Sequence, residues 1–281
     1  MLIRIKHKTT YKYSREVFLE PHTVRLRPRT DVCQNLREFR IDVNPEPAGI
    51  SYLSDAGGDT VFLWFDGMTE LLLISTESVV STARVNPYDF ILSDERSHSL
   101  PMEYAGAADN ILRTYRTPFY DIGPRVEALI AEELMQSGAD TLKFLTGLNA
   151  RIHDDFEYEI RREGDAKTPE QTATDKKGSC RDFVTLFNVA SRSLGLAARF
   201  VSGYSSGGPE GMDHELHAWS EVYLPGGGWR GFDPTLGLAV ANQHVALVSG
   251  AVPDDASPVS GTFRGTGAEA EMDYEIELEV T

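Results

Sequence analysis

The sequence predicts an α+β core preceded by a β-sandwich-like module, and three observations carry this prediction. Short segments of alternating apolar and polar residues fill the first hundred positions. Beyond residue 100, apolar residues recur at helical spacing in three separate stretches. Further strand-like segments then follow the helices, an order typical of α+β domains. We therefore expect a β-rich domain over residues 1–100 and a second domain over residues 101–281.

The β-rich domain is predicted from short strands separated by turns. Phe39, Ile41 and Val43 alternate with charged residues, the period-2 pattern of a strand with one buried face. The runs at residues 61–65 and 71–74 are continuously apolar, so we expect them to be buried on both faces. Turn-rich stretches at residues 44–47 and 55–59 separate these segments, which favours a sandwich.

The second domain should begin with helices. Pro124 is placed to start one, and apolar residues follow it at helical spacing; a second stripe runs from Leu142 to Ile152. A third helix should begin near Ser179 or Cys180 and end before Gly195. Strands are expected at residues 199–204 and 218–224, and another near the end of the chain with its acidic face in solvent.

Composition narrows the functional classes. The chain has 27 Lys+Arg against 43 Asp+Glu, a net charge of −16, which argues against nucleic-acid and anionic-membrane partners. No apolar run is long enough for a membrane helix, and the start alternates like a strand without the apolar core of a signal peptide. The two cysteines are too few for a disulfide framework. We expect a cytoplasmic protein with no cofactor.

Cys180 is the first candidate for chemistry. It follows a polar loop ending in Gly178-Ser179 and begins an apolar helix. The positive end of the helix dipole and the unpaired backbone N–H groups of the first turn both stabilise a thiolate, the nucleophilic form of cysteine. The alternative is a small buried apolar residue. Cys33 has no accompanying motif, so that alternative is preferred for it.

A cysteine nucleophile needs a base, and the base needs a group that orients it. His217 begins a predicted strand, and Asp233 ends the next one, just before Pro234. Two adjacent antiparallel strands would bring these side chains together, and the helix of Cys180 could pack against that sheet. Taken alone, His217 could be a core histidine and Asp233 a turn residue. The combination of Cys180, His217 and Asp233 is a more specific signal of nucleophilic chemistry than any one of them.

Four blocks of sequence resemble one known family, the transglutaminase-like superfamily and its bacterial branch often called cysteine proteases. They are Gly178-Ser179-Cys180-Arg181-Asp182-Phe183, residues 194–204, His217-Ala218-Trp219-Ser220-Glu221-Val222 and Gly228-Trp229-Arg230-Gly231-Phe232-Asp233-Pro234-Thr235. The blocks occur in family order with family spacing, and the β-rich opening resembles the N-terminal region of that branch. One departure is Ala197, where the family usually has proline.

The resemblance implies a papain-like core with Cys180 as nucleophile, His217 as base and Asp233 orienting the imidazole. It also implies acyl transfer through a thioester. The backbone N–H of Cys180 would be one oxyanion donor, and Tyr158 is our candidate for the second, with core packing as its alternative. For Asp182 we expect a structural role at the helix start, because its negative charge would oppose a thiolate.

The loop before His217 should border the cleft, and we take Glu210, Asp213 and Trp219 as cleft candidates. The acidic residues suggest a preference for cationic or amine-bearing groups, with a solvated loop as the alternative. His214 and His217 lack the spacing of a helical zinc protease, so no metal is expected.

We predict a hydrolase of peptide or isopeptide-type amides acting on a peptide or protein substrate. A protein-glutamine transglutaminase or deamidase is the first alternative, and a non-catalytic protein-binding module the second.

Overall fold

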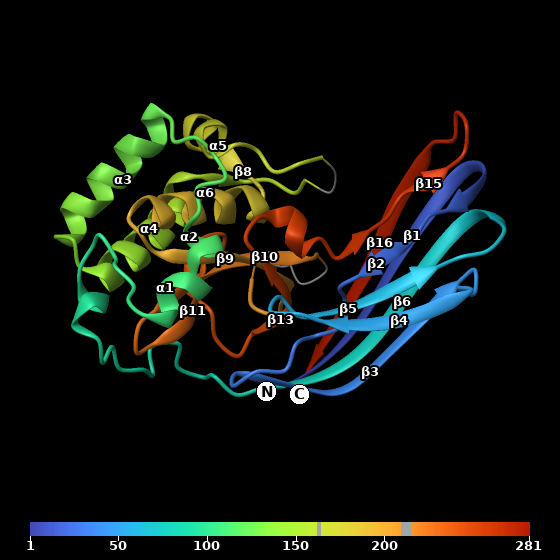
Figure 1. The fold of residues 1–281 in the computed structure, drawn as a ribbon, viewed down its shortest axis with the longest axis horizontal. Coiled ribbons are helices and arrows are strands. Elements are labelled where there is room, and N and C mark those ends of the chain that lie inside the picture. The colour runs from blue at the N-terminus through green and yellow to red at the C-terminus, as the bar shows by residue number, and fades with distance from the viewer. Residues whose placement is uncertain (162–163, 209–214) are drawn as a thin grey trace.

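The computed structural model describes residues 1–161, 164–208 and 215–281. It is a mixed α/β structure, which confirms the predicted fold class. Figure 1 shows two parts side by side, one made of long strands and one in which helices pack on a sheet. The two chain ends lie next to each other, because Leu2 and Thr281 exchange backbone hydrogen bonds of 2.9 Å in both directions.

The long-stranded part, which we call the β-module, contains two antiparallel sheets. One sheet has the order β15-β1-β6-β3, with β16 also paired to β1; the other has the order β14-β2-β5-β4. The strands are β1 (Leu2–Leu19), β2 (His22–Val24), β3 (Gln34–Asn44), β4 (Gly49–Ser54), β5 (Asp59–Trp64), β6 (Met68–Thr82), β14 (Val259–Ser260), β15 (Phe263–Arg264) and β16 (Ala270–Val280). Apolar residues of both sheets share one buried cluster.

The predicted domain boundary is wrong at the C-terminal end. We expected residues 101–281 to form one domain, but β16 pairs with β1 over eleven residue positions, from Ile3↔Val280 to Tyr13↔Ala270. The physical reason is the packing of the sheet: one face of β16 is buried against the module, with Ile276 in its apolar cluster. On the exposed face, β1 carries cations opposite the acids of β16, including Lys6 with Glu277 at 3.4 Å and Lys8 with Glu275 at 3.8 Å. The predicted acidic face is exposed, but it is also ion-paired across the two strands.

The two apolar runs of the β-module are buried on one face only. In β5, Val61 and Leu63 are fully buried whereas Trp64 is 40% exposed. In β6, Leu72 and Ile74 are buried, whereas Leu71 and Leu73 are partly exposed. The expectation of burial on both faces is therefore wrong, because each sheet of the sandwich is covered by the other on its inner face alone.

The remaining elements form the core, a sheet of order β12-β11-β10-β9-β13 with helices packed against it. They are α1 (Ala107–Ile111), α2 (Arg113–Arg116), α3 (Pro124–Ser137), α4 (Thr141–Asp155), β7 (Glu157–Tyr158), α5 (Pro169–Asp175), β8 (Lys177–Gly178), α6 (Cys180–Ser193), β9 (Ala197–Ser205), β10 (His217–Leu224), β11 (Gly228–Asp233), β12 (Leu238–Ala239) and β13 (His244–Gly250), with 3₁₀ turns at Glu95–His98 and Pro253–Ala256. No helix within the described part of the chain is long and apolar enough to cross a membrane.

The three predicted helical stripes all form helices. Pro124 is the first residue of α3, and Asp140 caps α4 by accepting from the Lys143 N–H at 2.9 Å. Gly195 follows α6 with a φ of +80°, the left-handed conformation that favours glycine after a helix end.

Ala197 makes a hydrogen bond that a proline would forbid. Its backbone N–H donates to the Tyr104 hydroxyl at 2.9 Å, and that hydroxyl donates to the Tyr223 carbonyl at 2.7 Å. A proline has no N–H to donate. The departure from the family pattern is thus matched by a buried tyrosine that links β9 to β10.

The β-module is anchored to the core by apolar contact and by a buried ion-pair group. Val184, Phe200 and Leu247 of the core belong to the same apolar cluster as the inner faces of the module. Beside it, Glu221 of β10 binds Arg29 of the module and Arg199 of β9, the latter at 2.6 Å. The two parts therefore share one continuous buried interface.

Candidate active site

Cys180 is the first residue of α6, as predicted. Helix α6 is buried along most of its length, and Phe183 and Phe187 lie in the main apolar cluster of the core. This packing fixes the helix, whereas the Cys180 side chain at its beginning is only partly buried and lines a cleft. The first N–H groups of a helix have no partner within it, so the thiol lies at the positive end of α6.

His217 and Asp233 are brought together by the pairing of β10 with β11. The two strands run antiparallel, with Ser220 opposite Phe232, so the beginning of β10 lies beside the end of β11. The His217 Nε2 is 2.7 Å from Asp233 Oδ2, and both side chains are almost completely buried. Cys180 lies close enough to His217 for its thiol to be among the causes that raise the pKa of the ring. Because Asp233 occupies Nε2, the ring nitrogen left for the thiol is Nδ1.

The Asp233 carboxylate is fixed on both oxygens. The backbone N–H groups of Thr235 and Leu236 donate to Oδ1 at 3.0 and 3.1 Å. Burial works to raise the pKa of Asp233, but the charge and hydrogen bond of His217 and the hydrogen bond of His244 outweigh it, and the pKa is lowered. Asp233 is therefore ionised at neutral pH.

The environment of His217 favours its protonated form. Burial works to lower the pKa of His217, but the Asp233 charge, the Asp233 hydrogen bond and the interactions with Cys180 raise it to about 10. An imidazolium ring in contact with Asp233 on one side and a thiol on the other can stabilise a thiolate. The arrangement can thus supply both a nucleophile and a proton donor.

His244 was not predicted from the sequence. It begins β13, and its Nε2 is 3.0 Å from the same Oδ2 of Asp233 that His217 contacts. Strand β13 pairs with β9 opposite Ser205, while His217 pairs with Gly203 on the other side of β9. The one available signal was a histidine directly before an apolar strand, the pattern that had also singled out His217.

The cleft beside Cys180 lies between the core and the β-module. Its volume is about 350 Å³, within the range typical of small-ligand pockets. Core residues form one wall, and β1 and β16 form the other, with side chains from both parts lining it: Tyr158, Arg161, Cys180, Leu216 and His217 from the core, and His7, Thr9, Tyr11, Met272 and Tyr274 from the module. Tyr274 is hydrogen-bonded to Glu215 across this cleft.

Tyr158 lies where an oxyanion donor could act. Strand β7 pairs in parallel with β8, which places Tyr158 opposite Gly178, two residues before Cys180, and its side chain lines the cleft. Burial first, and then the negative charges of Cys180 and Glu215, raise the pKa of Tyr158. Its hydroxyl therefore keeps its proton and can donate a hydrogen bond.

The predicted cleft role of Trp219 is wrong. Trp219 is 1% exposed, is absent from the cleft lining and packs edge-on against His244, with ring centroids 5.2 Å apart. As the second residue after His217 on the same strand it points the same way, but into the interior behind the histidines. Glu210, Asp213 and His214 lie outside the described residues.

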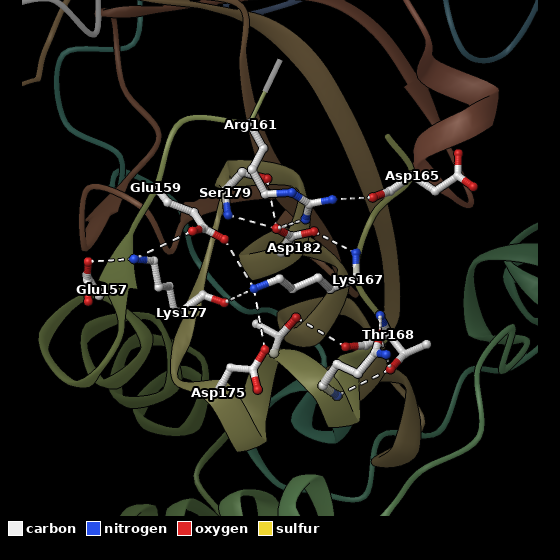
Figure 2. Close-up of polar contacts among 12 residues, drawn as sticks. Glu157, Glu159, Arg161, Asp165, Lys167, Thr168, Asp175, Lys177, Ser179 and Asp182 are labelled. Carbon is white, nitrogen blue, oxygen red and sulfur yellow. Dashed lines mark hydrogen bonds and ion pairs between the residues drawn. The ribbon is translucent and has the colours of Figure 1, made fainter. Parts of the chain in front are cut away.

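Asp182 has the structural role predicted for it. Figure 2 shows its carboxylate at the centre of a polar group. It accepts from the Ser179 N–H at 2.8 Å, from the Lys167 N–H at 2.7 Å and from the Arg161 guanidinium at 2.7 Å. Burial works to raise the pKa of Asp182, but the hydrogen bonds from Ser179 and Lys167 and the Arg161 charge lower it. Asp182 thus ties the cleft-lining Arg161 to the turn that presents Cys180.

Metal-ligand types also meet at this site. His217, Asp233 and His244 each offer one ligand atom, and these atoms lie within 4.8 Å of one another. However, the Nε2 of His217 and the Nε2 of His244 already lie at hydrogen-bonding distance from the same oxygen of Asp233, 2.7 and 3.0 Å away. A metal would have to replace both protons, so the donor set fits a hydrogen-bonded group better than a metal centre.

Comparison with known proteins agrees with this architecture. The model of the transglutaminase-like superfamily matches residues 129–234, and that of the bacterial transglutaminase-like N-terminal region matches residues 3–81. An uncharacterised protein of Mycobacterium leprae is 25% identical over 99% of this chain and 98% of its own length. A protein-glutamine gamma-glutamyltransferase of Pseudomonas aeruginosa is 31% identical over 41% of this chain and 19% of its own.

A solved structure shares the whole fold. The crystal structure of a protein named "Putative Cysteine Protease", from Cytophaga hutchinsonii, covers 100% of this chain and 91% of its own, with a TM-score of 0.71 at 20% identity. The β-module and the core therefore both occur in one solved structure. The chain therefore combines a transglutaminase-like core with the bacterial transglutaminase-like N-terminal region.

Proposed function

We propose that this protein is a thiol-dependent acyl-transfer enzyme that cleaves peptide or isopeptide-type amides. One observation carries the proposal: His217 is hydrogen-bonded through Nε2 to the buried Asp233 at 2.7 Å, it interacts with Cys180, and both His217 and Cys180 line one cleft. A nucleophile, a base and an orienting carboxylate in this sequence are the requirements of cysteine-dependent acyl transfer.

The chemistry follows from the protonation states. The Cys180 sulfur attacks the amide carbon, and the carbonyl oxygen becomes an oxyanion that the Cys180 N–H and the Tyr158 hydroxyl can stabilise. As the C–N bond breaks, the His217 imidazolium gives its proton to the leaving amine, leaving an acyl thioester on Cys180. A water molecule then attacks the thioester; His217 takes its proton, and the acid leaves with the thiolate restored.

A second candidate is a protein-glutamine transglutaminase or deamidase. The 31% identity to the gamma-glutamyltransferase of Pseudomonas aeruginosa favours it. The thioester would form in the same way, with ammonia as the leaving group, and an amine or water would resolve it. A non-catalytic binding module is disfavoured by the convergence of Cys180, His217 and Asp233, because a binding surface does not require a nucleophile, a base and an orienting carboxylate in this order beside a cleft.

Parallel assays separate these functions. Wild type, Cys180→Ala and the control Cys33→Ala are incubated with a peptide library, and with a glutamine-containing protein plus a fluorescent primary amine. Peptide cleavage that is lost in Cys180→Ala and kept in Cys33→Ala supports the amidase. Amine incorporation or ammonia release with the same dependence on Cys180 supports the second candidate. Equal behaviour of wild type and Cys180→Ala in all assays would refute both.

A further inference from the structure

His244 lies behind the candidate active site, where the proposed reaction leaves it without a role. It is 5% exposed and does not line the cleft, so it touches neither the nucleophile nor a bound substrate. Among the described residues, the only hydrogen bond of its side chain is to Asp233 Oδ2, at 3.0 Å. We propose that His244 is a positioning residue that holds the Asp233 carboxylate in the orientation His217 requires, an inference that rests on the function proposed above.

The surroundings of His244 define which of its nitrogens carries the proton. Within the described part of the chain, its Nδ1 is buried without a hydrogen-bond partner. A buried N–H without an acceptor is costly, whereas an unprotonated ring nitrogen leaves only a weaker acceptor unsatisfied. A proton therefore lies on Nε2, and Nε2–H donates to Asp233. The edge-on contact with Trp219 holds the ring in this position.

The partners of Asp233 explain why a second imidazole matters. Oδ1 receives two backbone N–H groups, from Thr235 and Leu236, whereas the donors to Oδ2 within the described ranges are the two histidine rings. Without His244, the hydrogen bond from His217 alone would offset the free-energy cost of burying Oδ2 away from water. The carboxylate would then be freer to turn about its Cβ–Cγ bond or to take up a proton, and either change would weaken its hold on the His217 ring.

Alkylation of Cys180 by iodoacetamide tests this inference without a natural substrate. Rates are measured at pH 7 with EDTA present for wild type, His244→Phe and His244→Gln, each also in an Asp233→Asn background. Phenylalanine keeps a ring against Trp219 but cannot donate, whereas the glutamine amide can. The control is His22→Phe, since His22 is an equally buried histidine (5% exposed) in the β-module and away from the cleft.

We expect His244→Phe to slow the alkylation of Cys180 about tenfold, the size of one hydrogen bond to a charged group. His244→Gln should stay within about threefold of wild type, and His22→Phe should leave the rate unchanged. In the Asp233→Asn background, His244→Phe should have no further effect, because its partner is gone.

An equal slowing in both backgrounds would mean that His244 merely supports the fold and would overturn the inference, as would a wild-type rate in His244→Phe. The outcome of this test can be told apart from the outcome of the test of the proposed function. If no amide is cleaved but the coupling to Asp233 is found, the role of His244 in holding Asp233 is supported and the proposed enzymatic function is rejected. If amides are cleaved and the coupling is absent, the reverse holds.

Discussion

The substitution Asp233→Asn should abolish most of the reactivity of Cys180. Two backbone N–H groups, from Thr235 and Leu236, already point at Oδ1 of Asp233, so the amide oxygen of an asparagine would take that place. Its NH₂ group would then face His217 and His244, where the carboxylate had accepted from both. His217 could no longer keep a proton on Nε2, and the ring would be held in the wrong tautomer, with its Nδ1 proton directed at the thiol.

The structure gives the magnitude. The pKa of His217 is raised from 6.5 to about 10, a preference for the imidazolium of about 5 kcal/mol at 1.36 kcal/mol per unit. The charge and hydrogen bond of Asp233 are the leading causes of this rise. Lowering the pKa of His217 by about two would shift the proton-transfer equilibrium between the Cys180 thiol and the ring about 100-fold away from the thiolate–imidazolium pair.

The assay is the rate of iodoacetamide labelling of Cys180 at pH 7, read by peptide mass spectrometry, with Cys33 in the same sample as the internal control. Burial raises the pKa of Cys33, so it should label slowly and equally in both proteins. Thermal unfolding verifies that the variant is folded. A Cys180 rate within threefold of wild type in folded Asp233→Asn protein would refute the electrostatic reasoning.

Three further predictions concern the supports of the site. In Glu221→Gln, the buried Arg29 and Arg199 lose the carboxylate that they share, and Arg29 keeps only Asp31, so urea denaturation should show a loss of about 3 kcal/mol at pH 7, against less than about 1 for the exposed Glu277→Gln. Burial works to raise the pKa of Glu221, but the two arginines lower it from 4.5 to about 2. The stability that this carboxylate contributes is therefore present above pH 4.5 and lost as the pH falls toward 2. A wild-type free energy of unfolding that stays constant across that window would contradict this assignment. Met272→Ala removes part of the cleft wall supplied by β16 and should raise KM for a peptide substrate several-fold while leaving the labelling rate of Cys180 unchanged; a changed labelling rate would mean that the wall acts on the thiol itself. Asp182→Asn breaks the link between Arg161 and the turn before Cys180, so hydrogen exchange in residues 177–183 should accelerate at least tenfold, and unchanged protection would show that the turn is held by other contacts.

Local patterns predicted the elements that carry the candidate site. The apolar residues after Cys180 recur at helical spacing and Gly195 can adopt a positive φ, so the helix and both of its ends follow from neighbouring residues alone. Likewise His217 and Asp233 flank short strands joined by a glycine-rich turn, and antiparallel pairing of two such strands needs no distant information. The sequence thus indicated three residues and the reason for their convergence.

Tertiary structure alone decided what surrounds them. Strand β16 is an acidic alternating segment at the end of the chain, and nothing local states that its partner is β1, more than 250 residues earlier in sequence. That pairing makes the β-module a wall of the cleft. The second imidazole on Asp233 has the same origin, since His244 reaches the carboxylate only because β13 joins the sheet beside β9. Periodicity reports which face of a segment is buried, whereas the choice of partner depends on the packing of whole sheets, which no short stretch of residues contains.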